Sequence, residues 1–147
     1  MKKVLFILVI GLLIFTHATA FEIGTVNRVV DGDTLKVMVN DEELTVRMLG
    51  VDTPESVKSG TPVQAGSLEA SDYTKQLTGK KVLLVYDKKR LDFYGRVLAY
   101  VWVEHPEGKG LVCWNLQLIK EGYGILYLKY KFDKSAWFLE ELAAEIQ

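Results

Sequence analysis

The stretch VDGDTLKVMVNDEELTVRMLGVDTPE, from Val30 to Glu55, decides the fold. It begins with Asp31-Gly32-Asp33 and ends with Asp52-Thr53-Pro54-Glu55, and two alternating apolar segments lie between these acidic ends. The alternation predicts two half-buried strands, and the polar turn Asn40-Asp41-Glu42 predicts that they pair as a hairpin. Such a hairpin brings the two acidic ends to one place, with the cation of Arg47 beside them.

The hairpin strands are predicted over Thr34 to Val39 and Leu44 to Val51. In the first strand one face carries Leu35, Val37 and Val39. In the second strand one face carries Leu44, Val46, Met48 and Gly50, and the other carries Thr45, Arg47, Leu49 and Val51. A long cation on an otherwise apolar face usually has an anionic partner. We therefore expect Arg47 to pair with a carboxylate.

The rest of the chain predicts a mainly β domain of the α+β class. Further strands are expected at Phe21–Val30, Lys81–Tyr86 and Arg96–Val103, with a short return at Leu111–Cys113, and loops at Ser56–Gly66 and Asp87–Gly95. A first helix is expected from an N-cap at Ser67 to Gly79, with Leu68, Tyr73 and Leu77 on its apolar side. A second, short helix is expected at Asn115–Glu121, before Gly122. A third is expected after Asp133, with Leu139 among its apolar residues. Five strands with a helix after the third predict a five-stranded Greek-key barrel of the OB type with three helices, an architecture that commonly binds oligonucleotides. A different α+β fold also fits this pattern.

The first twenty residues are typical of a secretory signal peptide. Two lysines precede the apolar run Val4 to Phe15, and His17-Ala18-Thr19-Ala20 supplies an ending of small residues. The alternative is a membrane anchor, but the run is about a dozen residues long and a membrane span needs about 20. We expect cleavage after Ala20. The product would be a secreted or periplasmic domain of residues 21–147 with no stable membrane anchor.

The charge balance excludes a generally basic surface. The chain has 18 Lys and Arg against 19 Asp and Glu, and loss of Lys2 and Lys3 with the signal would lower the net charge from -1 to -3. Affinity for phosphate must then come from local cations and a bound metal.

Three other residue types receive structural interpretations. Cys113 is the only cysteine, which excludes an intrachain disulfide, and its apolar neighbours indicate a buried, unreactive thiol. His105 lies in a polar turn without metal-binding partners, so we expect it to be exposed. The tryptophans are interpreted as core residues because their neighbours are apolar; they are Trp102, Trp114 and Trp137.

The acidic ends of the hairpin predict a site for a hard metal ion. Asp33 lies at the start of one strand and Asp52 just past the end of its partner, so both carboxylates can lie at one rim. Adjacent carboxylates repel unless a cation lies between them, and oxygen ligands favour Ca²⁺ or Mg²⁺. Glu55 follows the stiff Thr53-Pro54 step and can take a proton from a water molecule as a general base.

Two arginines complete the parts needed to cleave a phosphodiester. Arg47 and Arg96 offer planar groups suited to phosphate oxygens, and cleavage needs a metal, an activated water and cations where charge develops. Each part also has a structural interpretation. Asp-Gly-Asp is a common turn, Arg96 fits an ion pair at a strand edge, and Glu55 fits a solvated acid. Their joint occurrence favours a catalytic site.

Several motifs together resemble the staphylococcal nuclease family. They are VDGDT at Val30–Thr34, VRMLGVDTPE at Val46–Glu55, DFYGRVLAY at Asp92–Tyr100, Glu69-Ala70, and Asn115 with LIKEG at Leu118–Gly122. The resemblance extends from about Gly24 to the last helix. In combination these motifs are highly specific, although Asp-Gly-Asp-Thr by itself is not.

The resemblance implies a calcium-dependent nuclease that hydrolyses DNA and RNA with little sequence preference and leaves 3′-phosphates. We expect a monomer whose partners are these substrates, with single strands favoured. The resemblance implies that Asp33, Asp52 and the Thr53 carbonyl bind Ca²⁺, with Asp31 nearby but not bound to it directly. It implies that Glu55 orients or deprotonates the attacking water and that Arg47 and Arg96 bind the phosphate. Tyr94 and Tyr130 would line the nucleotide pocket.

The chain departs from the family pattern at two nucleotide contacts. Phe93 stands where the best-known member has a lysine, and Leu128 stands where it has a pocket tyrosine, although Tyr127 is adjacent. Two alternative functions remain. One is a non-catalytic nucleic-acid-binding module on the same barrel. The other is an envelope interaction domain with a structural Ca²⁺, in which Phe93, Leu128 and the aromatic C-terminal third would suit an apolar partner.

Overall fold

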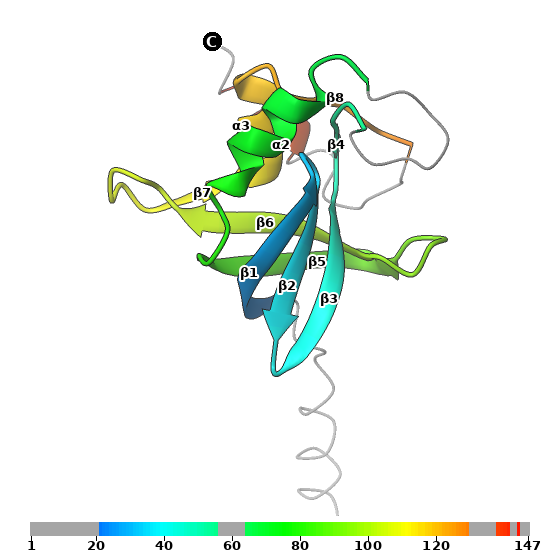
Figure 1. Cartoon of the computed structure of the whole chain (residues 1–147), viewed down its shortest axis with the longest axis vertical. Coiled ribbons are helices and arrows are strands. Elements are labelled where there is room, and N and C mark those ends of the chain that lie inside the picture. The colour runs from blue at the N-terminus through cyan, green and yellow to red at the C-terminus, as the bar shows by residue number, and fades with distance from the viewer. Residues whose placement is uncertain (1–20, 56–63, 130–137, 142–143, 145–147) are drawn as a thin grey trace, which may run out of the picture.

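The computed structural model describes residues 21–55, 64–129, 138–141 and 144, which form a β-barrel with helices at one end (Figure 1). Several predictions lie outside the described residues. They concern the signal peptide at residues 1–20, most of the Ser56–Gly66 loop, Tyr130, and the Asp133 cap and Trp137 of the last helix. Residues 138–141 and 144 of that helix are helical. Phe138 is fully buried, whereas Leu139, which the sequence placed in the apolar stripe of this helix, is exposed.

Five strands close the barrel and confirm the predicted OB-type architecture. They are β1 (Phe21–Asp31), β2 (Thr34–Val39), β3 (Glu42–Met48), β5 (Lys81–Leu91) and β6 (Val97–Glu104). The sheet order is β3-β2-β1-β5-β6-β7, and a parallel pairing of β3 with β6 closes it. The strand β7 (Leu111–Cys113) extends the sheet beyond β6.

The predicted hairpin forms, and its turn has the expected chemistry. Asn40 and Asp41 have φ angles of 48° and 65°, which two-residue hairpin turns require and which asparagine and aspartate tolerate. The predicted inner face of β2 is buried in the core. Gly24 of β1 lies against it, where a Cβ would be 2.5 Å from Val37 Cγ1, so a larger residue would push the barrel wall apart.

The predicted strand Leu44–Val51 is broken, which is a correction with consequences for the site. The strand β3 ends at Met48, and the chain turns at Leu49–Gly50 before the two-residue strand β4 (Val51–Asp52). Gly50 has a φ of 76°, and a Cβ there would lie 2.7 Å from Phe138 Cζ. Because of this turn the predicted alternation fails, and Val51 packs in the same core cluster as Met48.

The predicted loop Asp87–Gly95 is shorter than expected, because β5 continues to Leu91. Leu91 pairs with Val97 after a shift in register, so the extension carries charged residues into solvent while the backbone stays extended. Arg90 lies over the Tyr86 ring, with its Cζ 3.4 Å from the ring centre. What remains as a loop is the tight connection from Asp92 to Arg96.

Two helices cover one end of the barrel, where Figure 1 also places β4 and β8. They are α2 (Ser67–Lys75) and α3 (Trp114–Lys120), and α3 matches its prediction to within one residue at each end. The helix α2 begins at Ser67 as predicted, but the N-cap is Gly66, with a φ of 82°, and Ser67 is the first helical residue rather than the cap. Leu68 is 61% exposed, so its assignment to the apolar side was also wrong.

The buried face of α2 consists of small and mostly polar side chains, so the pattern of apolar residues did not predict it. Its members are Ser67, Ala70, Ser71 and Thr74. A Cβ on Gly32 would lie 2.9 Å from the Ala70 Cβ, and Thr74 Oγ1 donates a hydrogen bond of 2.7 Å to the Gly32 carbonyl. The helix therefore packs directly on the turn between β1 and β2. No helix in the described ranges is long and apolar enough to cross a membrane.

The residues given structural interpretations behave mostly as expected. Cys113 is 5% exposed, which confirms the predicted burial, and this burial raises the pKa of its thiol to about 12. Trp114 is buried in the core and Trp102 is half-buried. His105 is half-buried rather than exposed, and its Nδ1 accepts a hydrogen bond from the Glu107 amide.

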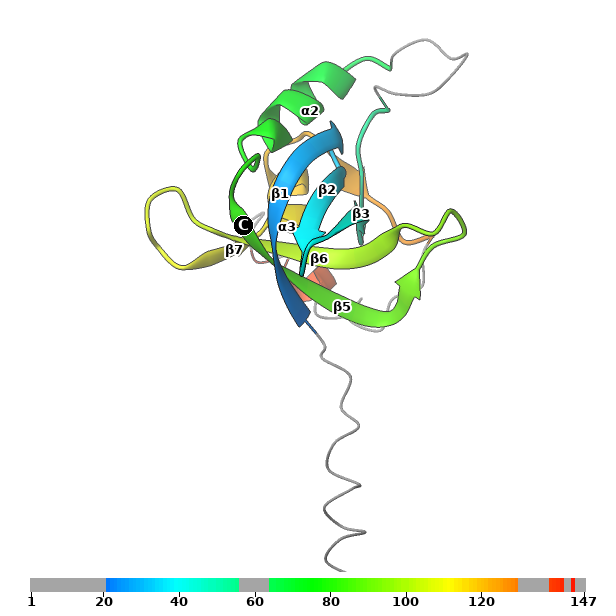
Figure 2. The same ribbon diagram turned by 60° about the horizontal axis from the view of Figure 1, so that its bottom comes forward.

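Two connections project from the barrel on opposite sides, as Figures 1 and 2 both show. One joins β5 to β6 and the other joins β6 to β7. The small sheet formed by β4 and β8 (Ile125–Leu126) lies near the first of these connections in Figure 1. The pocket described next is built between the β5–β6 connection, β4 and the β1–β2 turn.

Candidate active site

A single pocket of about 220 Å³ gathers every predicted site residue that the structure describes. Tyr130 lies outside the described residues. The pocket is lined by Asp31, Asp33, Thr34, Arg47, Asp52, Thr53, Glu55, Tyr94, Arg96, Tyr127 and Lys129. These residues come from the β1–β2 turn, the β3–β4 segment, the β5–β6 connection and the segment after β8. Residues up to 98 positions apart in the chain (Asp31 and Lys129) thus share one cavity.

Asp33 is held in place by both ends of the hairpin. Its carbonyl accepts a hydrogen bond of 2.9 Å from the Met48 amide, at the end of β3. Its carboxylate accepts bonds of 2.9 Å from Thr34 Oγ1 and 2.8 Å from the Thr53 amide. The side chain is 6% exposed. This carboxylate is therefore oriented by the fold before any ligand arrives.

Arg47 is buried, and both of its terminal nitrogens have hydrogen-bond or ion-pair partners. Its Nη1 donates to the carbonyls of Met48 at 2.9 Å and Val51 at 2.8 Å, which flank the Leu49–Gly50 turn. Its Nη2 lies 2.7 Å from Asp52 Oδ1 and 3.3 Å from Asp33 Oδ2. The expected carboxylate partners of this cation are thus present. The same side chain also braces the turn that breaks the strand, which the sequence did not indicate.

Asp52 and Glu55 add two carboxylates of different exposure. The Asp52 side chain is partly buried, with 42% of its surface exposed, whereas Glu55 is exposed to solvent. The pKa of Asp52 is raised, first because burial disfavours its charged form; Asp33 and Glu55 raise it further, while Arg47 and Arg96 oppose the rise. Three acids and two arginines therefore interact electrostatically at this position.

Gln64 fixes the backbone of Glu55. The Glu55 amide donates to Gln64 Oε1 at 2.9 Å, and the Gln64 amide donates to the Glu55 carbonyl at 3.2 Å. These two bonds tie together the ends of the segment between residues 55 and 64. The Glu55 side chain consequently projects into the pocket from a defined backbone position.

Arg96 is presented by a tight loop built around Asp92. The Asp92 carboxylate is fully buried, and its Oδ2 lies 2.6 Å from Arg96 Nε. Its Oδ1 accepts the amides of Tyr94 and Arg96, each at 2.9 Å. The Arg96 side chain is 27% exposed, and its Cζ lies 5.5 Å from the centre of the Tyr94 ring. The loop therefore orders Arg96 while leaving part of it open to solvent.

Asn115 has a role that sequence reasoning missed. It is fully buried at the start of α3, and its Nδ2 donates to the carbonyls of Leu49 at 2.9 Å and Ala99 at 3.0 Å. Its Oδ1 accepts the Val101 amide at 2.8 Å. One side chain thus fixes the Leu49–Gly50 turn against β6. An asparagine at the first turn of a helix gave no local signal of these long-range bonds.

Tyr127 and Lys129 also line the pocket, although neither was predicted to do so. Arg47 Cζ lies 6.0 Å from the centre of the Tyr127 ring. The two residues alternate with Leu128 in a segment whose structure the sequence left open. That alternation is the signal by which they could have been found.

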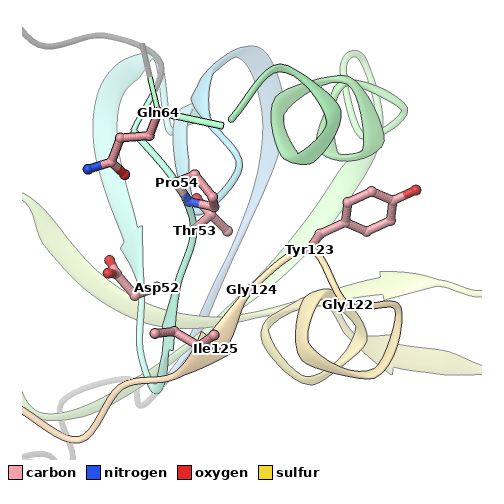
Figure 3. Close-up of a pocket in the computed structure, with 8 residues that line it drawn as sticks. All are labelled: Asp52, Thr53, Pro54, Gln64, Gly122, Tyr123, Gly124 and Ile125. Carbon is pink, nitrogen blue, oxygen red and sulfur yellow. The ribbon is translucent and has the colours of Figure 1, made fainter. Parts of the chain in front are cut away.

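A second pocket of about 240 Å³ lies across β4 from the first. Figure 3 shows it between β4, Gln64 and the segment Gly122–Ile125, with the Asp52 side chain pointing away from Tyr123. Gly124 permits the close approach of this segment, because a Cβ there would lie 2.6 Å from Val51 Cγ2. Asp52 and Thr53 line both pockets, so β4 is the wall between them.

The donor set at the first pocket consists of oxygen atoms. Within the described ranges, no three His, Cys, Asp or Glu side chains are grouped as a metal ion would require. Asp33 and Asp52 nevertheless converge on one nitrogen of Arg47, so one positively charged group bridges the two carboxylates. Two carboxylates with carbonyl, water or phosphate oxygens suit a hard cation such as Ca²⁺.

Comparison with known proteins reveals clear relatives. A family model described as staphylococcal nuclease homologue matches residues 45–145. The thermonuclease of Staphylococcus hyicus is 52% identical over 96 residues, which cover 65% of this chain and 53% of that protein. The thermonuclease of Staphylococcus intermedius is 42% identical over 123 residues, covering 83% and 70% of the two chains. Endonuclease YncB of Bacillus subtilis (strain 168) is 38% identical over 125 residues, covering 84% and 56%. The chain spans between half and seven-tenths of the length of these relatives.

Proposed function

This chain belongs to the staphylococcal nuclease family, and we propose that it is an endonuclease that hydrolyses phosphodiester bonds of DNA and RNA. The observation that carries the proposal is the single pocket in which four acids, two arginines and two tyrosines converge. The names of the relatives, thermonuclease and endonuclease, support the same reaction class.

We propose that Asp33 and Asp52 hold Ca²⁺ with their carboxylates, and that Thr53 adds its backbone carbonyl. Support comes from the oxygen-only donor set and from the convergence of both carboxylates on Arg47. When bound, such a cation neutralises charge on the phosphate and makes attack by water easier. Asp31 also lines the pocket, where it acts on the cation from a distance.

Glu55 is the proposed general base. Its carboxylate accepts a proton from a water molecule while the water oxygen forms a bond to phosphorus. The bond from phosphorus to the 5′-oxygen breaks, that oxygen takes up a proton from solvent, and the product strand keeps a 3′-phosphate. The backbone hydrogen bonds with Gln64 hold Glu55 in position for this step.

The two arginines act on the phosphate. Arg47 is already fixed by its bonds to Met48 and Val51, so its charge is in place before the transition state forms. Arg96, which the β5–β6 connection presents to the pocket, stabilises the charge that grows on the leaving oxygen. Tyr94 lines the pocket beside Arg96 and contacts the nucleotide; Tyr130 is proposed for the same role on sequence grounds.

We propose that the protein acts outside the cytoplasm as a monomer. The basic, apolar and small-residue pattern of residues 1–20 supports export with cleavage after Ala20. The N-terminal sequence of the protein purified from the culture medium or periplasm tests this. A product that begins at Phe21 supports export with the predicted cleavage, and a full-length cytoplasmic protein contradicts it.

A nuclease assay with Ca²⁺ and with a chelator tests the function. We expect cleavage of single-stranded DNA and of RNA with Ca²⁺, loss of cleavage with the chelator, and recovery when Ca²⁺ is restored. End-group analysis of the fragments should find 3′-phosphates and 5′-hydroxyls. Equal activity in both conditions, or none in either, would contradict the proposal.

A further inference from the structure

The connection between β5 and β6 exposes aromatic side chains that the fold does not bury. Phe93 is 94% exposed and Tyr94 is 78% exposed, and Leu91 at the end of β5 is 51% exposed. A single exposed apolar residue is ordinary, but three within four positions form a local apolar surface. Phe93 contributes nothing to a core, because nearly all of its surface remains in water.

The conformation of this loop does not depend on Phe93. The Asp92 amide donates to the Arg96 carbonyl at 2.9 Å, and the Gly95 amide donates to the Asp92 carbonyl at 3.2 Å. The Asp92 carboxylate accepts two further amides, and Gly95 supplies the left-handed φ of 77°. Because none of these bonds uses the Phe93 side chain, the fold leaves this position open to almost any residue. The loop holds the ring out in solvent on a fixed backbone.

The two rings lead into the pocket. Phe93 and Tyr94 meet edge to face, with centres 5.8 Å apart and planes at 88°. Tyr94 and Arg96 both line the pocket, and the Arg96 guanidinium lies near the Tyr94 ring. Figure 1 shows the β5–β6 connection projecting from the barrel, so its tip can be reached by a long substrate. Phe93 does not line the pocket itself, but it contacts Tyr94, which does, so its ring lies one side chain away from the pocket.

We propose that Phe93 stacks on an unpaired nucleobase near the phosphate that is cleaved, so that the β5–β6 loop selects single-stranded nucleic acid. The proposal deepens the proposed function and rests on it. Every base offers a flat π-face, so stacking on an aromatic ring tolerates any sequence. The chain carries a net charge of -1, so general electrostatic attraction to a polyanion is weak and a non-ionic contact has more to contribute. In a duplex, interior bases are already stacked on both faces and offer Phe93 no partner.

Steady-state kinetics on matched single-stranded and duplex oligonucleotides, with Ca²⁺ present, test this inference. Phe93→Ala should raise KM for the single strand by roughly 5- to 20-fold, in line with the loss of one base–aromatic stack. The value of kcat and the KM for the duplex should stay within about twofold, because the ring touches no reacting atom. Phe93→Trp should keep the low KM, whereas Phe93→Leu, which is apolar but not planar, should behave like Phe93→Ala.

Phe21→Ala is the matched control. Phe21 is 54% exposed, but it begins β1, at the opposite end of that strand from Asp31. The same loss of an exposed ring there should leave both KM values unchanged. An unchanged KM for Phe93→Ala on the single strand would overturn the inference, and so would full rescue by leucine, since that would indicate a general apolar contact rather than stacking.

A binding measurement separates this inference from the proposed function. If the wild-type protein cleaves nothing, the proposed function fails, and affinity for a single strand containing 2-aminopurine is then compared between wild type and Phe93→Ala. Weaker binding of the variant by about 5- to 20-fold, with loss of the stacking-dependent fluorescence change, supports the inference. Equal binding, or no binding by the wild type, overturns it.

Discussion

Arg47 and Arg96 line the same pocket, but the structure places them in opposite settings. Arg47 is 6% exposed in its side chain, donates to two backbone carbonyls and lies between two carboxylates. Arg96 is 27% exposed and is positioned by Asp92 on a projecting loop. One arginine is part of the framework that shapes the pocket. The other is delivered to it by a separate structural unit.

This difference means that similar substitutions should have different consequences. A buried cation that braces a turn cannot be removed without leaving its carbonyls and carboxylates unsatisfied. Arg96 is partly exposed, and its side chain can be changed while Asp92 keeps its hydrogen bonds to the backbone amides of the loop. Loss of activity at Arg47 therefore combines two causes, whereas loss of activity at Arg96 reports the chemistry more directly.

Arg47→Ala should give the largest effect and lower both stability and activity. We expect the free energy of unfolding to fall by about 3–5 kcal/mol, because the change strands a buried ionic cluster. Cleavage should fall by at least the ~10²–10³-fold associated with loss of one preorganised donor. Urea unfolding and single-turnover cleavage measure the two effects. A variant of wild-type stability would show that Arg47 does not brace the Leu49–Gly50 turn.

Arg96→Lys should separate activity from stability. The lysine keeps a positive charge but loses the planar group, so cleavage should fall by ~10²–10³-fold. The midpoint of thermal unfolding should change by less than ~2 °C, because Asp92 keeps its bonds to the Tyr94 and position-96 amides. Calorimetry and single-turnover assays on the same preparation provide the check. A large drop in the melting midpoint would contradict the contrast with Arg47.

Asn115→Ala should act on the framework side of the comparison. It removes three buried hydrogen bonds that join the Leu49–Gly50 turn to β6, so we expect a loss of roughly 2–4 kcal/mol in unfolding free energy. Asn115→Asp is the matched variant, since it keeps the acceptor for Val101 but loses both donors. If the Asn115→Ala variant had the same unfolding free energy as the wild type, Asn115 would not be needed to hold the Leu49–Gly50 turn, and Arg47 and Gly50 would suffice.

Asp92→Asn should give the smallest effect and act on the loop side. The amide can still accept backbone N–H groups, but it no longer carries the charge that faces Arg96 Nε at 2.6 Å. We expect about 1 kcal/mol less stability and roughly tenfold slower cleavage, because Arg96 is less well positioned. Matched unfolding and cleavage measurements on both Arg96→Lys and Arg96→Lys/Asp92→Asn test the link. If Asp92→Asn slows the Arg96→Lys variant by a further tenfold, Asp92 does not act through Arg96.

The sequence predicted the parts of the pocket better than their setting. Alternation and turn chemistry placed β2, the hairpin and α3 correctly, because these features are local. The break at Leu49–Gly50 could not be read from the pattern, since it depends on Phe138 packing under Gly50 and on Asn115 bonding from another part of the chain. For the same reason the bracing role of Arg47 emerged only with the three-dimensional fold.

The buried face of α2 illustrates a second limit. A stripe of serine, alanine and threonine has no apolar signature, yet it packs on the β1–β2 turn because small side chains allow close approach. The exposed Leu68 carried the apolar signal on the wrong side of the helix. Packing distance, rather than hydrophobicity, decided which face was buried.

Single-turnover cleavage of single-stranded DNA by Glu55→Gln, with Ca²⁺ present, tests the central claim most directly. Glutamine has nearly the same shape as glutamate, and Glu55 is exposed, so the substitution should leave the fold intact. Thermal unfolding of the variant verifies this. We expect cleavage to be slower by ~10²–10⁴-fold with substrate affinity retained, as for the loss of a general base. Cleavage by Glu55→Gln at the wild-type rate would show that Glu55 does not activate the attacking water.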